Sequence, residues 1–352
     1  MKILELPKSA GPREWGRIHG RVYGPEIAQL AQIRLELIMT NWKSPAETVL
    51  EVAAQHLPVL EAFDRDLFEE FSGIAEGSRV DPARLIVLNH YTDLRDLKRP
   101  EQVPEEGCTA LYARSSRGIF LGQTWDMHAT AAPFVLMLKI PEPEMWVLSI
   151  TGCLGMCGQH HNGYGVTINN LLSTDARVGV VWPALVRKML AAGSTRAGHQ
   201  VLLDAPIGAG HHYMLADADQ VVAVETSGRL KKTVYAGEQP VFYHTNHCVD
   251  AEVGACSTVS DASTTYLRYD RASEELGALK DPSFDQLWNV LGSKNGYPQS
   301  IFTNMATPAN PAGMFTCARI LMSIRDRRLV ALSGLEGTGA GLDFSFETSL
   351  AR

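Results

Sequence analysis

The pattern of apolar residues changes near residue 107, and this change constrains the fold more than any other feature. Before it, apolar side chains recur at helical spacing. After it, short apolar runs follow one another through turns of Gly, Pro and charged residues. The stretch between them, "KRPEQVPEEG" at residues 98–107, is polar and contains two prolines, which is typical of a linker. We therefore expect a helical N-terminal segment, residues 1–107, and a sheet-rich segment, residues 108–352.

The N-terminal segment predicts four helices. The first begins at Pro25, which suits a first helical turn. The second opens with Ser44 as N-cap and Glu47 three residues later, the spacing of a capping box. The expected helices cover residues 25–42, 44–63, 64–80 and 81–97.

The sheet-rich segment predicts an α+β fold. Its strands are joined by short turns, which connect antiparallel neighbours, whereas parallel strands need long crossovers. Two layers of sheet flanked by helices, in one compact domain, follow from this order. The expected strands cover residues 108–114, 118–125, 134–140, 145–150, 163–172, 211–217, 220–227, 231–237 and 240–247, with a closing hairpin over 314–334.

Composition excludes several classes of function. The net charge is −7 and Lys and Arg form no long run, which disfavours nucleic acid or an anionic membrane as partner. The chain has no stretch of about 20 apolar residues and no signal-peptide pattern, so we expect a cytoplasmic protein. The glycine-rich motifs for nucleotides and the G-x-S-x-G esterase motif are absent, so we expect no cofactor.

Two clusters of Cys and His suggest zinc, but neither has good ligand geometry. Cys153 and Cys157 precede two histidines, yet the surrounding loop is rich in glycine and has no second matching pair. In a strand, His244 and His247 would point to opposite faces. We expect no metal site.

Cys108 allows three interpretations: a packed core residue, a metal ligand, or a nucleophile exposed when the Gly107–Cys108 bond is cut. A cut there would leave an α-amino group beside the thiol, and the pKa of such an amine is about 7.7–8.0. Nucleophile and base would then belong to one residue. Gly107 fits such a cut because it has no Cβ and leaves its carbonyl open to attack.

The segment "EEGCTALYARSSRGIFLGQTWDMH", residues 105–128, resembles the start of the catalytic chain in the acyl-coenzyme A:6-aminopenicillanate acyltransferase family. That family belongs to the cysteine N-terminal-nucleophile (Ntn) hydrolases. The resemblance rests on Gly107-Cys108-Thr109, on Gly122-Gln123-x-Trp125-Asp126 and on the "HTNH" block at residues 244–247. It covers about residues 105–250, and residues 280–352 match weakly.

The resemblance implies a four-layer αββα sandwich that cuts itself into an α chain, residues 1–107, and a β chain, residues 108–352. It implies Cys108 as the nucleophile of both cleavage and catalysis. Asn246 would give its side-chain amide to the oxyanion hole, and Asp126 would orient the groups around the nucleophile. Further candidates for substrate binding are Thr109, Trp125, Tyr164 and His244.

Two departures from the family pattern put penicillin chemistry in doubt. Ala110 stands where the penicillin-forming members carry a second threonine, and Arg319 is shifted by several residues from their C-terminal arginine. We therefore expect an amidohydrolase that cleaves another linear amide, with a small-molecule amide or acyl compound as partner. The alternatives are an acyltransferase with an acyl-coenzyme A donor and an uncleaved, non-catalytic binding protein. A homo-oligomer of cleaved heterodimers remains open.

Overall fold

The computed structural model describes residues 1–98, 107–260 and 263–346. The expected linker therefore lies almost entirely outside the described residues. The helices of the N-terminal segment are α1 (Pro12–Trp42), α2 (Ala46–Ala54), α3 (His56–Phe63), α4 (Arg65–Ser78), α5 (Pro82–Asn89) and α6 (Tyr91–Leu97). The later helices are α7 (Trp182–Ala191), α8 (Thr195–Asp204), α9 (Ala251–Gly254), α10 (Thr265–Gly277) and α11 (Phe284–Leu291), with two short 3-10 turns, Ala129–Phe134 and Gly334–Glu336.

The strands form two sheets. The first has the order β1-β4-β5-β6-β7-β8-β9-β10, and the second has the order β11-β2-β3-β12-β13-β14. Only the β1–β4 pair is parallel among the described strands. The first sheet contains β1 (Lys2–Glu5), β4 (Val135–Pro141), β5 (Glu144–Ile150), β6 (Cys157–His160), β7 (Gly165–Asn170), β8 (His211–Ala216), β9 (Val221–Thr226) and β10 (Lys231–Tyr235). The second contains β2 (Ala110–Ser115), β3 (Gly118–His128), β11 (Val241–His244), β12 (Met314–Ser323), β13 (Arg328–Ser333) and β14 (Leu342–Ser345).

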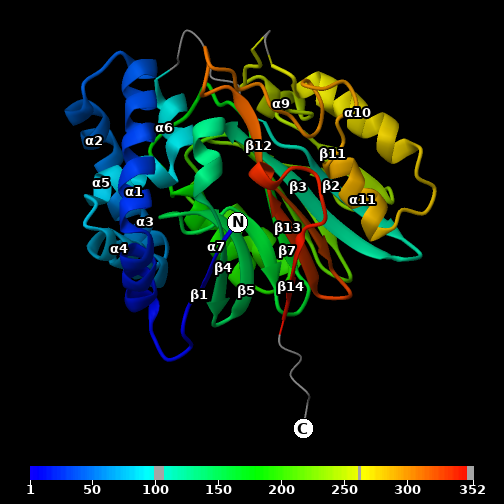
Figure 1. Cartoon of the computed structure of the whole chain (residues 1–352), viewed down its shortest axis with the longest axis horizontal. Helices are drawn as coiled ribbons and strands as arrows, with labels where there is room; N and C mark the ends of the chain where they lie inside the picture. The colour runs from blue at the N-terminus through cyan, green and yellow to red at the C-terminus, as the bar shows by residue number, and fades with distance from the viewer. Residues whose placement is uncertain (99–106, 261–262, 347–352) are drawn as a thin grey trace.

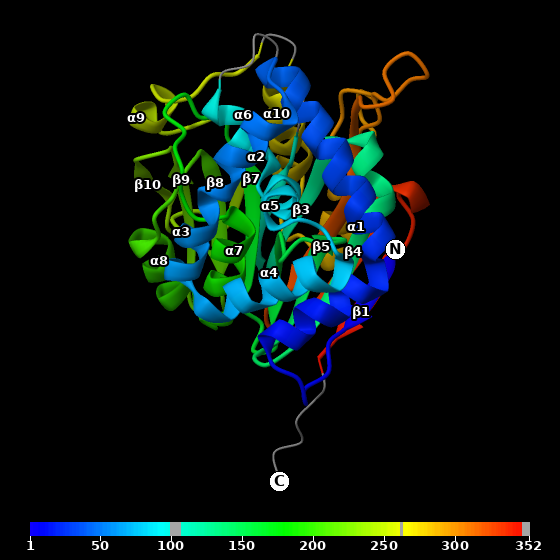
Figure 2. The same cartoon turned by 90° about the vertical axis from the view of Figure 1, so that its left-hand side faces the viewer.

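The two sheets stack between two layers of helices. Figure 1 shows α1–α5 on one side, the sheets in the middle, and α10 and α11 on the far side. Figure 2 shows α7 and α8 in the same helical layer as the N-terminal helices. The expected α+β fold with the order αββα is confirmed.

Alternate residues of each strand enter different cores. In β4, Met137 packs between the sheets, whereas Leu136 and Leu138 pack outward under α7 and α8. In β3, Leu121 faces the space between the sheets, whereas Phe120 packs under α10 and α11. Because both faces of each sheet are buried, these strands read as continuous apolar runs rather than as alternating patterns.

Three helix predictions differ from the structure. The first helix begins at Pro12 and runs through Pro25, with non-helical dihedral angles at Tyr23; a proline removes one helical hydrogen bond, so the helix kinks there. Neither the expected second helix nor the expected fourth is continuous, because they break at Gln55 and His90. No side chain caps α2, and the capping box predicted from Ser44 is absent.

Candidate active site

The Gly107–Cys108 peptide lies where the chain enters β2, beside the end of β3. The Gly107 carbonyl accepts a hydrogen bond from the Asp126 backbone N–H at 2.8 Å, and the Gly107 N–H donates to the Asp126 carbonyl at 3.2 Å. A Cβ at Gly107 would stand 2.9 Å from an Arg268 nitrogen and 3.1 Å from a carboxyl oxygen of Asp126. A side chain at this position would therefore displace the Arg268 guanidinium or the Asp126 carboxyl, which disfavours any residue larger than glycine before Cys108.

Asn246 holds the other end of this peptide. The Cys108 N–H donates to Asn246 Oδ1 at 2.7 Å, and Asn246 Nδ2 donates to the Asn170 carbonyl at 2.8 Å. An amide nitrogen carries two hydrogens, so one hydrogen of Nδ2 is left for a further acceptor. The Gly107–Cys108 peptide is thus bound at its carbonyl by Asp126 and at its N–H by Asn246.

Arg268 joins these groups and was not expected from the sequence. It lies on α10 and is fully buried. Its guanidinium donates to the Cys108 carbonyl at 2.7 Å, to Asn246 Oδ1 at 2.9 Å and to the Thr109 hydroxyl at 3.3 Å. A planar, permanently charged donor suits such a junction of several oxygen acceptors. Arg319, the arginine considered from the sequence, instead donates to the carbonyls of Trp288 and Gly339 behind the second sheet.

Asp126 is a buried carboxyl beside the Gly107–Cys108 peptide. Burial raises its pKa from 3.8 to about 6, and the Arg268 charge and the hydroxyls of Thr316 and Thr124 act in the opposite direction. Desolvation disfavours the charged form, whereas a nearby cation favours it. A carboxyl with this pKa accepts and returns protons near neutral pH.

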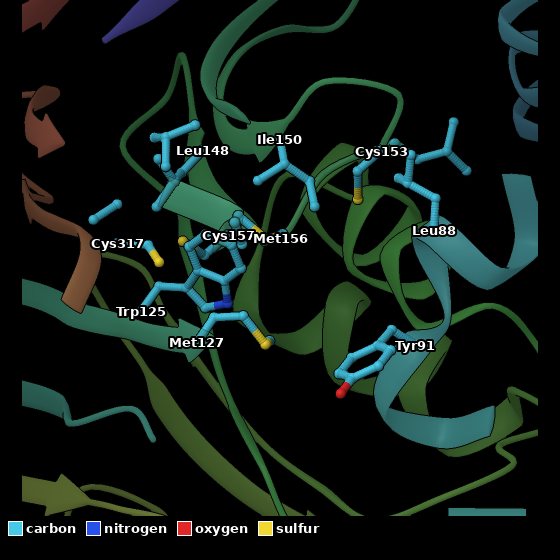
Figure 3. Packing of buried hydrophobic residues seen from close by; sticks show 14 of the residues in the cluster. Leu88, Tyr91, Trp125, Met127, Leu148, Ile150, Cys153, Met156, Cys157 and Cys317 are labelled. Atoms are coloured by element: carbon cyan, nitrogen blue, oxygen red, sulfur yellow. The ribbon is translucent and has the colours of Figure 1, made fainter. Parts of the chain in front are cut away.

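Cys108 and Asp126 line a narrow, partly open pocket whose cavity volume is about 30 Å³. Its wall is mainly apolar. Figure 3 shows Trp125 and Met156, two residues of this wall, packed together within the buried hydrophobic cluster. Cys108 is only 5% exposed and belongs to the hydrophobic cluster between the sheets, and it also lines this pocket. The pocket is lined by Thr92, Gly107, Cys108, Trp125, Asp126, Met127, Met156, Ile168, Asn170, Trp182, His211 and Asn246.

Of the four further candidates for substrate binding, the structure brings only Trp125 to the pocket wall. Thr109 lies behind the thiol, where its backbone N–H donates to the Thr124 hydroxyl at 3.0 Å and its own hydroxyl meets Arg268. Tyr164 is fully buried in the core under α8, where it packs against Gly198. Neither Thr109 nor Tyr164 lines the pocket that contains Cys108.

His244 is also buried away from the pocket, and it supports the loop that carries Asn246. Its Nε2 lies 2.8 Å from a Glu225 carboxylate oxygen, and its Nδ1 lies 2.7 Å from the Thr245 carbonyl. The ring therefore links the Glu225 side chain to the backbone at Thr245. Glu225 also accepts from the backbone N–H groups of Val249 and Asp250. This pair fixes the chain on both sides of Asn246.

Within the described ranges, no group of three or more His, Cys, Asp and Glu side chains is arranged to hold a metal ion. All six cysteines, including Cys153 and Cys157, are free thiols. In the part of the chain that the structure describes, no helix is both long and apolar enough to cross a membrane.

Comparisons with known proteins identify the family to which this chain is similar. The sequence pattern of the family described as acyl-coenzyme A:6-aminopenicillanic acid acyl-transferase matches residues 113–313. This range includes Asp126, Asn246 and Arg268 and begins just after Cys108. The acyl-coenzyme A:6-aminopenicillanic-acid-acyltransferase 40 kDa form of Emericella nidulans is 23% identical over 306 residues, which are 85% of this chain and 84% of that protein.

Two solved structures are also similar. A mutant of the conjugated bile acid hydrolase from Clostridium perfringens has a TM-score of 0.39 at 10% identity and covers 69% of this chain and 97% of its own. Penicillin V acylase from Agrobacterium tumefaciens has a TM-score of 0.38 at 12% identity, over 69% of this chain and 86% of its own.

Proposed function

Because the chain belongs to the acyl-coenzyme A:6-aminopenicillanic acid acyl-transferase family, we propose that it is a cysteine amidohydrolase that activates itself by cutting the Gly107–Cys108 bond. The mature enzyme, with chains 1–107 and 108–352, cleaves a linear amide through a thioester acyl-enzyme. The observation that carries this proposal is the scissile peptide itself, held at its carbonyl by the Asp126 N–H and at its N–H by Asn246 Oδ1.

Self-cleavage begins when the Cys108 sulfur attacks the Gly107 carbonyl carbon. The thiol proton passes to the Asp126 carboxylate, and the developing oxyanion keeps its hydrogen bond from the Asp126 N–H, at 2.8 Å in the ground state. The C–N bond then breaks, and the departing amine takes the proton back from Asp126. The resulting thioester is hydrolysed by water, which leaves a carboxylate on Gly107 and a free thiol and amine on Cys108.

Turnover uses the same atoms in the cleaved chain. The new amine of Cys108 has a pKa of about 7.7–8.0 and takes the thiol proton, while Asn246 Oδ1 holds that amine in place. The sulfur attacks the substrate carbonyl, and the second hydrogen on Asn246 Nδ2 meets the oxyanion. The Cys108 amine then protonates the leaving amine, and water releases the acid. Apolar residues of the pocket, Trp125, Met127 and Met156 among them, receive the acyl group.

Acyl transfer is the second candidate, and it is favoured by the name of the Emericella relative. Hydrolysis and transfer share the acyl-enzyme and differ only in whether water or an amine attacks it. A third candidate, an uncleaved binding protein, requires that the Gly107–Cys108 bond stay intact.

The test is a panel of simple N-acyl amines and acyl-coenzyme A thioesters, assayed for free acid and for acyl transfer to added amines. We expect acid to form from amides, and we expect an acyl group on Cys108 in mass spectra of quenched reactions. Transfer to amines that outpaces hydrolysis would favour the acyltransferase instead. Processed enzyme that acylates on a residue other than Cys108 would refute the proposal, with Cys317→Ala as a matched control for a nearby buried thiol.

A further inference from the structure

Two polar side chains of the pocket wall have no part in the proposed chemistry. Thr92 comes from α6 in the N-terminal segment, and His211 comes from the first position of β8. Both line the pocket that contains Cys108, and both are buried, with exposed fractions of 4% and 3%. Buried polar groups of this kind need hydrogen-bond partners. The neighbouring wall contains the apolar Ile168 and Trp182, whose buried indole N–H has no partner among the described residues.

Asp93 determines which atoms of Thr92 and His211 can act as hydrogen-bond acceptors for a ligand. The Thr92 hydroxyl donates to Asp93 Oδ1 at 3.0 Å, and His211 Nε2 lies 3.4 Å from the same oxygen. Burial, aided by the Arg95 charge, lowers the pKa of His211 to about 3, so the ring is neutral. A neutral ring beside a carboxylate carries its proton on the facing nitrogen, which leaves Nδ1 as an acceptor. The Thr92 oxygen, having given its hydrogen to Asp93, is also an acceptor.

Other charged and titratable groups around Asp93 keep this arrangement in place. His90 Nε2 lies 3.6 Å from the second carboxylate oxygen of Asp93, and the buried Arg95 pairs with Asp96 at 2.8 Å. Asp96 in turn accepts from the Ser173 N–H at 2.9 Å, which ties α6 to the loop that follows β7. Thr92 and His211, both residues of the pocket wall, are thus held by a buried network that runs through Asp93.

We propose that Thr92 and His211 form a subsite that accepts a hydrogen bond from an O–H or N–H group of the substrate. The inference deepens the proposed function, on which it rests, by naming a substrate class: amides that bear a hydroxyl or amino group within reach of this wall. A ligand with a methyl group there would leave buried acceptors unpaired, which costs more than the hydrogen bond contributes when made. Thr92 lies in residues 1–107, so the proposed α chain would take part in substrate selection.

The donor group can belong to the acyl side or to the amine side of the amide, and matched ligand pairs separate the two. On the amine side, N-hexanoyl ethanolamine is compared with N-hexanoyl propylamine. On the acyl side, N-propyl 6-hydroxyhexanamide is compared with N-propyl heptanamide. Each pair exchanges one hydroxyl for one methyl group at the same position.

Binding to the full-length Cys108→Ala protein, measured by calorimetry, tests the subsite without depending on turnover. We expect the hydroxylated member of one pair to bind about tenfold more tightly or better. Thr92→Val should remove that preference and Thr92→Ser should keep it, because serine restores the hydroxyl. Ile168→Val, a control on the apolar wall, should weaken both members alike.

Equal binding of both members of each pair, or no binding of any of the four ligands, would overturn the inference. A preference that survives in both Thr92→Val and His211→Phe would also overturn it, because it would place the discrimination elsewhere. Assays of the wild-type enzyme keep the two proposals apart. If the enzyme cleaves amides but binds both members of each ligand pair equally, only the subsite proposal is refuted. If it binds the hydroxylated ligand selectively but cleaves no amide, only the proposed function is refuted.

Discussion

Replacing Asp126 by Asn should remove a pH-dependent contribution to the stability of the fold and should also slow self-cleavage. The substitution keeps the size of the side chain and removes its titration. In the folded protein the pKa of Asp126 is about 6, against an ordinary value of 3.8, so the folded chain binds this proton more tightly than the unfolded chain. The carboxyl therefore contributes stability below about pH 4, and that contribution is lost as the pH rises through 6.

The size of this effect follows from the two pKa values. They differ by about two units, and one unit corresponds to about 1.4 kcal/mol, so the charged carboxylate costs the fold about 3 kcal/mol well above pH 6. Between pH 4.5 and pH 7.5, about 2 kcal/mol of this change should be measurable. An asparagine has no such dependence, so the Asn variant should gain stability relative to its parent as the pH rises.

The assay is urea unfolding across this pH range, with Cys108→Ala compared with the double variant Cys108→Ala/Asp126→Asn, so that both chains stay whole. In the Cys108 background, Asp126→Asn should slow self-cleavage by about a hundredfold or more, the range for loss of a general base. A stability difference that is flat with pH, or one that falls as the pH rises, would refute the electrostatic reasoning about Asp126.

Three other variants test the neighbours of this carboxyl. Arg268→Met removes the charge that lowers the Asp126 pKa, so the acid limb of self-cleavage, followed on gels across pH, should move up by about one unit or more; an unmoved limb would contradict this. Asn246→Ala should lower the cleavage rate and kcat by about 10²–10³, and unchanged kinetics would remove its assigned role. Glu225→Gln should lower kcat more than it changes KM, because it loosens the loop around Asn246. A lower melting temperature with an unchanged kcat would show that Glu225 has only a structural role.

The layer order could be predicted from the sequence, but the strand order could not. Short turns between apolar runs indicated antiparallel sheets flanked by helices, and the sandwich confirms this. Residues such as Leu136 and Met137 are both apolar although they enter different cores. With both faces buried, no polar alternation marks which side of a strand faces which layer, so the pairing of β2 with β11 and of β3 with β12 lay beyond sequence reasoning.

Sequence motifs identified some residues of the candidate site. Other residues could not be identified from the sequence, because only the folding of the chain brings them to the site. Cys108 and Asn246, both named from the sequence, lie side by side, and the Cys108 N–H donates to Asn246 Oδ1. Arg268 was missed because an arginine in a helix usually faces solvent; its spacing with Ala272 and Leu276 on the buried face of α10 was the available signal. Thr92 and His211 are far apart in sequence and come together only because α6 packs over the end of β8.

Intact-mass analysis of the purified wild-type chain beside Cys108→Ala tests the central claim most directly. We predict two wild-type chains, one ending at Gly107 and one beginning at Cys108, whose masses sum to that of the full chain plus one water. From 38.5 kDa over 352 residues, these are about 12 and 27 kDa, and the Ala variant should stay at full length. A wild-type protein that remains whole while it cleaves amides, or a Cys108→Ala protein that is cut at the same bond, would contradict the account.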